Sequence, residues 1–198
     1  MAFTVPPPRT PSDGGLARWY EDELGWATVA GPPVRLVTGL RFDVLELPAA
    51  AGRGVLHRMG TETGPVALVG RRMGLLVAAG SAEELPGLLD WLEWGGISLD
   101  LAALGTDGRM TAPLPPGRSG SGAPGAAVWL RAPAPGREVE SSLPALRSAP
   151  WGPATPPCLV RLVAAAAAEC HRTRLLSARA HGAGPAAQQL SPQRFASS

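Results

Sequence analysis

Apolar residues recur with helical spacing in several stretches of the chain. The clearest stretch is 81–94, whose apolar face has leucines at i, i+3, i+4 and i+7: Leu85, Leu88, Leu89 and Leu92. Ser81 and Glu84 form a capping box at its start, and two glycines follow its end. The pattern also predicts helices over 15–24, 49–59 and 157–179, and a shorter one over 139–147.

Short apolar runs bounded by glycine or proline predict strands. These runs cover residues 26–29, 34–37, 42–47, 65–69, 75–78, 97–99, 109–112 and 126–130. The step Gly70-Arg71-Arg72 between two of them predicts a hairpin turn. Helices and strands do not alternate regularly, so the predicted fold class is α+β with a mixed sheet rather than a series of βαβ units.

Proline-rich segments suggest how the chain is divided. We expect a disordered arm at 1–14, an α+β domain at 15–131, a proline-rich connector at 132–156, a long C-terminal helix at 157–180 and a disordered tail at 181–198.

The net charge and the cysteines limit the partners and the cellular compartment that we expect. A formal net charge of +2 is too small to indicate a nucleic-acid or membrane partner through the overall field. The two cysteines and three histidines show no metal-ligand or redox spacing. Without a signal-peptide pattern or an apolar run long enough for a bilayer, we expect a cytoplasmic chain with reduced thiols and no membrane partner.

Carboxylates are the first candidates for chemistry, because two-metal phosphoryl transfer needs them. Asp43 and Glu46 stand three apart in a predicted strand, and strand side chains alternate with a period of two. The pair therefore lies on opposite faces unless a bulge intervenes. The favoured interpretation makes Glu46 a strand-end carboxylate and Asp43 an edge residue. Asp100 and Asp107 flank a predicted turn.

Arginine and tryptophan supply the candidate binding residues. Arg161, Arg172 and Arg179 are separated by 11 and 7 residues, so they return to nearly the same angle on the C-terminal helix. Such a stripe either contacts phosphates or forms a solvated face. Trp91 and Trp94 flank the leucine-rich helix, where they are either core or an interaction patch.

Residues 16–131 resemble the N-terminal domain of bifunctional DNA primase/polymerases, in the short form common in actinobacteria. The matching pieces, in order, are 16–29 (LARWYEDELGWATV), 34–39 (VRLVTG), 44–48 (VLELP), 72–80 (RMGLLVAAG) and 99–116 (LDLAALGTDGRMTAPLPP). They fall where that family has its opening helix and strand, its first acidic motif, a strand bearing histidine and a DLRG segment. The resemblance implies a mainly antiparallel sheet packed with helices.

The resemblance also implies a site that this chain has lost. The family binds two divalent metals through a D-x-D pair and grips the nucleotide phosphates with a histidine. Glu46 stands at the first acidic position, but Pro48 stands at the second and Met73 replaces the histidine. Ala102 replaces the DLRG arginine, although Asp100 remains. One carboxylate does not clamp two cations, so we predict neither polymerase nor primase activity and no cofactor.

Three functions follow from these observations. The first is a degenerate primase/polymerase-like domain that weakly binds nucleotide or single-stranded nucleic acid, or regulates a partner. Its contacts would come from Arg41, Arg71, Arg72, Arg161, Arg172 and Arg179. The alternative is a protein-interaction module that keeps only the scaffold and uses Trp91 and Trp94. The weaker alternative is an active nucleotidyltransferase, with Asp43, Glu46 and Asp100 converging on Mg²⁺ through a bulge.

Overall fold

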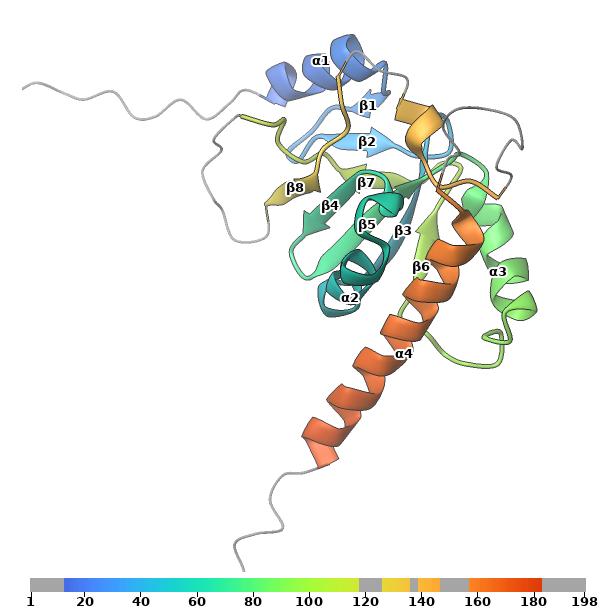
Figure 1. Ribbon diagram of the computed structural model, residues 1–198. Coiled ribbons are helices and arrows are strands. Elements are labelled where there is room, and N and C mark those ends of the chain that lie inside the picture. Colours follow the sequence, from blue (N-terminus) through green and yellow to red (C-terminus); the bar gives the residue numbers. More distant parts are fainter. Residues whose placement is uncertain (1–12, 118–125, 136–138, 147–156, 183–198) are drawn as a thin grey trace, which may run out of the picture.

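The computed structural model describes residues 13–117, 126–135, 139–146 and 157–182 (Figure 1). Most of the predicted arm, parts of the connector and nearly all of the predicted tail lie outside these residues. Among the described residues, no helix combines the length and apolarity needed to cross a bilayer.

Two sheets organise the fold. The five-stranded sheet has the order β6-β3-β5-β4-β8, and the three-stranded sheet has the order β1-β2-β7. Their strands are β1 Thr28–Val29, β2 Arg35–Val37, β3 Asp43–Pro48, β4 Val66–Val69, β5 Arg72–Val77, β6 Ala102–Leu104, β7 Arg109–Thr111 and β8 Ala127–Arg131. Neighbouring strands in both sheets pair antiparallel, which confirms the α+β prediction with a mainly antiparallel sheet.

Four α-helices pack around these sheets. They are α1 Asp13–Leu24, α2 Ala49–Met59, α3 Ser81–Trp91 and α4 Leu159–Gly182, with 3-10 turns η1 Gly60–Thr63 and η2 Val139–Ser142. Figure 1 shows α2 and α4 in front of the five-stranded sheet, α3 to the right of β6 beside α4, and α1 beside the three-stranded sheet. The lower end of α4 projects past the body of the molecule in this view.

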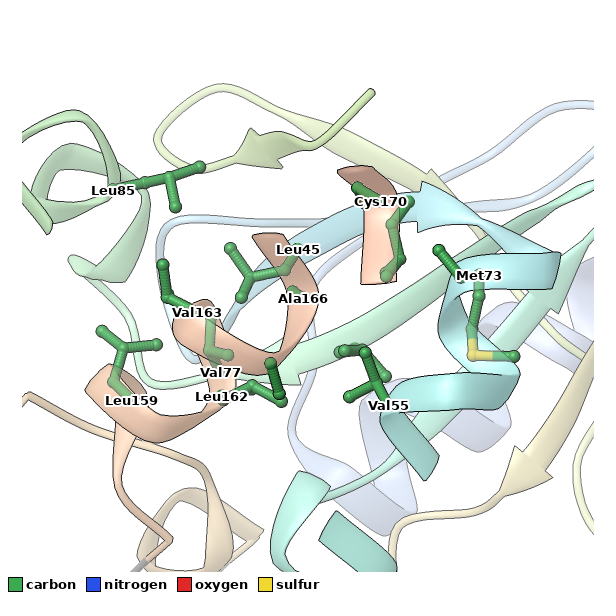
Figure 2. Close-up of a cluster of buried hydrophobic side chains, with 14 of the residues drawn as sticks. Leu45, Val55, Met73, Val77, Leu85, Leu159, Leu162, Val163, Ala166 and Cys170 are labelled. Atoms are coloured by element: carbon green, nitrogen blue, oxygen red, sulfur yellow. The ribbon is translucent and has the colours of Figure 1, made fainter. Parts of the chain in front are cut away.

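The five-stranded sheet separates two cores. The helix-side core joins the sheet to α2, α3 and α4 through Leu45, Leu47, Val55, Met73, Leu75, Val77, Leu85, Leu159, Leu162 and Val163, among others. The aromatic core joins the opposite face to α1 and the three-stranded sheet through Tyr20, Trp26, Leu36, Phe42, Val44, Leu76 and Met110, among others. Figure 2 shows side chains of α4 pointing toward those of β3 and β5 in the helix-side core.

Two glycines let α2 approach its neighbours closely. A Cβ at Gly52 would meet the side chain of Met73, and a Cβ at Gly54 would meet the carboxylate of Glu169 on α4. Alanines on α4, including Ala165 and Ala166, are also small and are buried. Small side chains therefore set the short separation between this helix layer and the sheet.

Three element predictions are wrong in their bounds or type. The strand expected at 97–99 is absent, and the edge strand is instead β6, which pairs with β3. Helix α3 ends at Trp91 because Glu93 takes a positive φ of 63° and Trp94 N–H bonds back to the Leu89 carbonyl. The helix expected over 139–147 is only the four-residue turn η2 within the described residues.

Candidate functional site

A cleft of about 810 Å³ opens where the ends of several elements meet. Its walls are the first turn of α2, the β4–β5 turn, the segment 98–100 and one face of α4. Three arginines from three of these elements line it: Arg53, Arg71 and Arg174. The volume lies within the usual range for sites that hold small molecules.

The junction of β3 and α2 forms one wall of the cleft. Pro48 is both the last residue of β3 and the N-cap of α2, and no side chain caps this helix. The Ala49 N–H donates to the Arg71 carbonyl at 2.9 Å, which ties the start of α2 to the β4–β5 turn. Gly70 permits that turn with a φ of 57°. The positive end of the α2 dipole therefore faces the cleft, where Ala50 lines the wall.

The charges in the cleft are mainly positive. Arg53 and Arg71 are exposed and make no ion pair with any residue that the structure describes. Arg174 donates to the Ser98 carbonyl, and within the described part of the chain no carboxylate forms an ion pair with it. Asp100 is the acidic residue among those lining the cleft, and it forms an ion pair with Arg72. Phosphate groups suit such a set of donors.

Arg72 holds two strands together beside the cleft. Besides the ion pair with Asp100, its guanidinium donates to the Glu46 carbonyl at 3.1 Å. This arginine therefore joins β5, β3 and the segment before β6, and its positive charge compensates the Asp100 carboxylate.

Cys170 contributes a neutral thiol to the wall of the cleft. Burial raises its pKa to about 12, and the Asp100 carboxylate acts in the same direction. Its thiol donates weakly to the Asp100 carbonyl at 3.5 Å. Because the thiolate is the nucleophilic form, this cysteine is not an activated nucleophile at neutral pH.

The three candidate carboxylates do not come together. Asp43 lies on the helix side of β3 with Leu45, and Glu46 lies on the opposite face with Val44, as the strand period predicts. Asp100 belongs to the cleft. Among the described residues, no group of three or more histidine, cysteine, aspartate or glutamate side chains is placed to hold a metal ion.

Asp43 has a structural role in the interior of the protein. The prediction that it is an edge residue is wrong, because β3 is an interior strand and Asp43 is fully buried. One carboxylate oxygen accepts from the Ala82 N–H at 2.9 Å, at the start of α3. Burial raises the pKa of Asp43, and repulsion from Glu83 adds to the rise while backbone N–H donors oppose it.

Met73, Pro48 and Ala102 occupy three different surroundings. Met73 is buried beneath Gly52 of α2, in the helix-side core. Pro48 lines the cleft, and Ala102 lies on the edge strand β6 opposite Glu46. The side chain of Met73 therefore faces away from Glu46, on the other side of the sheet.

The remaining sequence candidates for nucleic-acid contact lie outside the cleft. Arg41 pairs with Glu140 at 2.8 Å, and Arg161 pairs with Glu62 at 3.0 Å. Arg172 lies 3.6 Å from Glu169, which also pairs with Arg58, and Arg179 is exposed near the end of α4. The predicted stripe of arginines is therefore real as a helix face, but it points away from the cleft.

Sequence reasoning missed Arg53 and Arg174. The signal for Arg174 was present, because the polar face of α4 that lines the cleft recurs at i, i+3, i+4 and i+7: Cys170, Thr173, Arg174 and Ser177. Nothing near Arg53 in the sequence distinguishes it from a solvated helix arginine.

The two tryptophans of the α3 region differ in exposure. Trp91 is 71% exposed, whereas Trp94 is half-buried and its ring packs against His171 with centroids 5.6 Å apart. Trp94 thus joins the end of α3 to α4, and Trp91 is the side chain available at the surface.

Comparisons of this chain with protein-family models, with curated proteins and with solved structures found no match.

Proposed function

We propose that this chain is a catalytically degenerate primase/polymerase-like domain that binds phosphate groups of single-stranded nucleic acid or of a nucleotide in the arginine-lined cleft. The observation that carries the proposal is that Arg53, Arg71 and Arg174 line one cleft. Asp100, the acidic residue among the lining residues, already forms an ion pair with Arg72. The resemblance in sequence suggests the class of ligand, and the charges suggest which part of the ligand is held.

Arginine is well suited to this role. Its planar guanidinium stays charged and presents several N–H donors that match two phosphate oxygens at once. The uncapped first turn of α2 adds N–H groups and the positive end of a helix dipole. Because the net charge of the whole chain is only +2, attraction to a phosphate depends on this local arrangement.

Binding without transfer is the form of the proposal that the geometry favours. Asp43 is committed to the start of α3, and Glu46 points to the other face of the sheet from Asp43. A pair of cations needs several converging carboxylates, and bringing these together would require remaking the central strand β3.

Salt dependence gives the sharpest test. Contacts from three arginines to a single strand predict that log K falls against log salt with a slope of about −2. A labelled oligothymidylate should therefore lose about 15- to 20-fold in affinity, measured by fluorescence anisotropy, between about 50 mM and about 200 mM NaCl.

Charge-removing variants locate the site. Arg53→Gln with Arg71→Gln should weaken binding at least about tenfold and flatten the salt slope by about 1.4, to about −0.7. The matched control is Arg35→Gln with Arg109→Gln, two exposed arginines of the three-stranded sheet. Equal loss in the two double variants, or no salt-sensitive binding at all, would contradict the proposal.

Competition separates the two sources of phosphate. If an unlabelled deoxynucleoside triphosphate displaces the oligonucleotide, the cleft holds a mononucleotide; if only a longer strand displaces it, the cleft holds the backbone. A nucleotide-incorporation assay with Mg²⁺ or Mn²⁺ should show no product. Incorporation that disappears in Glu46→Ala would instead support the active nucleotidyltransferase.

A further inference from the structure

The outward face of α3 combines acidic side chains with one large exposed aromatic ring. Glu83, Glu84 and Asp90 are exposed, and α3 contains no basic residue. Trp91 lies seven residues, or about two helical turns, beyond Glu84, so both belong to the same outward stripe. An exposed tryptophan of this kind is typical of interface centres.

The projecting end of α4 carries the complementary chemistry. Arg172, Leu175, Leu176 and Arg179 follow one another at i, i+3, i+4 and i+7, so they share one face. Leu175 is 48% exposed and Leu176 is 55% exposed. This face lies opposite the face of α4 that lines the cleft, because Arg174 and Ser177 are about half a turn away around the helix.

These two surfaces are neighbours in one copy of the chain. The ring of Trp94, just after α3, packs against His171 of α4, and Arg174 binds the Ser98 carbonyl in the segment that follows. Figure 1 shows α3 and α4 side by side on the same face of the sheet. The segment 94–98 therefore lies between the acidic α3, with Trp91, and the basic end of α4, with its two leucines.

We propose that this α3–α4 surface (Glu84, Asp90, Trp91, Arg172, Leu175, Leu176 and Arg179) binds a second copy of the chain across a two-fold axis. A two-fold interface must be complementary to itself, and a surface with an acidic half and a basic half satisfies this condition when one copy is rotated onto the other. The acidic α3 of each copy then meets the basic end of α4 of its partner. Three of the exposed large apolar side chains become covered: Trp91, Leu175 and Leu176.

This contact does not depend on the arginine-lined cleft. The cleft uses the opposite face of α4, so a dimer leaves it open, and either proposal can fail without the other.

The oligomeric state of the full chain tests the contact directly. At about 100 µM protein and about 50 mM salt, sedimentation equilibrium should give a dimer with a dissociation constant of about 1–10 µM. At about 500 mM salt the dimer should weaken, because its charge pairs are screened. A monomer under the low-salt condition would overturn the proposal.

Charge exchange identifies which surfaces meet. One variant, Arg172→Gln with Arg179→Glu, makes the α4 end acidic; a second, Glu84→Arg with Asp90→Arg, makes α3 basic. Each variant alone should be monomeric, because like charges then face each other at both contacts. A mixture of the two should restore a dimer, because each contact again joins opposite charges. Dimers that persist in both separate variants would overturn the assignment.

Two substitutions of apolar residues provide a second test that does not depend on charge changes, which could disturb folding. Trp91→Ser should raise the dissociation constant at least about tenfold without lowering the melting temperature of the monomer. Leu40→Ser is the matched control, since Leu40 is 66% exposed but lies outside the α3–α4 surface. Equal effects of these two substitutions on association would exclude the proposed surface.

Discussion

The two faces of the five-stranded sheet are covered in different ways. On the helix side, the contacts to α2, α3 and α4 are aliphatic, and glycine and alanine set the closest approaches. On the opposite side, aromatic rings pack among the aliphatic side chains: Trp26 packs on Phe42 with centroids 4.4 Å apart and stacks with Tyr20 at 6.0 Å.

Hydrogen bonds of Tyr20 further distinguish the aromatic side. The Tyr20 hydroxyl donates to the Pro113 carbonyl at 2.7 Å and accepts from the Trp129 indole N–H at 2.9 Å. Burial raises the pKa of Tyr20, and the bond from Trp129 acts in the opposite direction. The tyrosine therefore remains a neutral phenol that joins α1 to the segment after β7 and to β8.

This difference indicates that the aromatic side serves as the scaffold, whereas the helix side contains the candidate binding site. Large rings with fixed hydrogen bonds leave one arrangement for the aromatic side. On the helix side, α2, α4 and two loops leave a space between them, and this space is the arginine-lined cleft. Substitutions on the aromatic side should therefore affect folding, whereas substitutions at the cleft should affect binding.

The largest effect should come from the aromatic side. Trp26→Ala should lower the free energy of unfolding by about 3–5 kcal/mol, because it removes a buried ring and leaves a cavity. Urea denaturation followed by circular dichroism measures this loss. The exposed Trp91→Ala should change stability by no more than about 0.5 kcal/mol. Similar losses for the two tryptophans would contradict the division between scaffold and surface.

A smaller effect should come from the close approach on the helix side. Gly52→Val should cost about 1–3 kcal/mol, because its side chain would collide with that of Met73 in a packed core. Gly87→Ala, at an exposed helical position with open space around it, should instead stabilise by about 0.5–1 kcal/mol. If thermal melting shows Gly52→Val to be as stable as the parent chain, the helix layer is less tightly fitted than we infer.

The smallest effect should come from Asp43. Asp43→Ala should cost about 1 kcal/mol, since the N–H of Ala82 at the start of α3 loses its acceptor. Asp43→Asn keeps an acceptor oxygen and should cost less at neutral pH, because it avoids burying a charge.

The pH dependence separates these two roles of Asp43. Its folded-state pKa is raised, so protonation favours the fold, and the advantage is complete below the ordinary aspartate pKa. The stability of the parent chain relative to Asp43→Asn should therefore be greatest below about pH 4 and fall as the pH rises through the folded-state pKa. Denaturant titrations across this range measure the difference. A relative stability that rises with pH would show that the carboxylate is favoured in its charged form.

The period of two along β3 was sufficient to separate Asp43 from Glu46, and the structure confirms that they face opposite cores. The helical spacing likewise located α3, because it depends on residues within a few positions of one another. The capping box predicted from Ser81 and Glu84 is wrong: the N-cap is Gly80, no local side chain caps the helix, and the Ala82 N–H donates to Asp43 instead. The sequence did not reveal that Asp43 anchors the start of α3, since that bond joins residues 39 positions apart.

The sequence by itself determined the periodic elements and the faces they bury. Only the tertiary structure decided that Arg53, Arg71 and Arg174 share a cleft, and that the stripe of Arg161, Arg172 and Arg179 does not belong to it. The reason is physical: local spacing governs how a segment folds, but which segments meet depends on the packing of a whole core, and a charged cleft exists only where their ends converge.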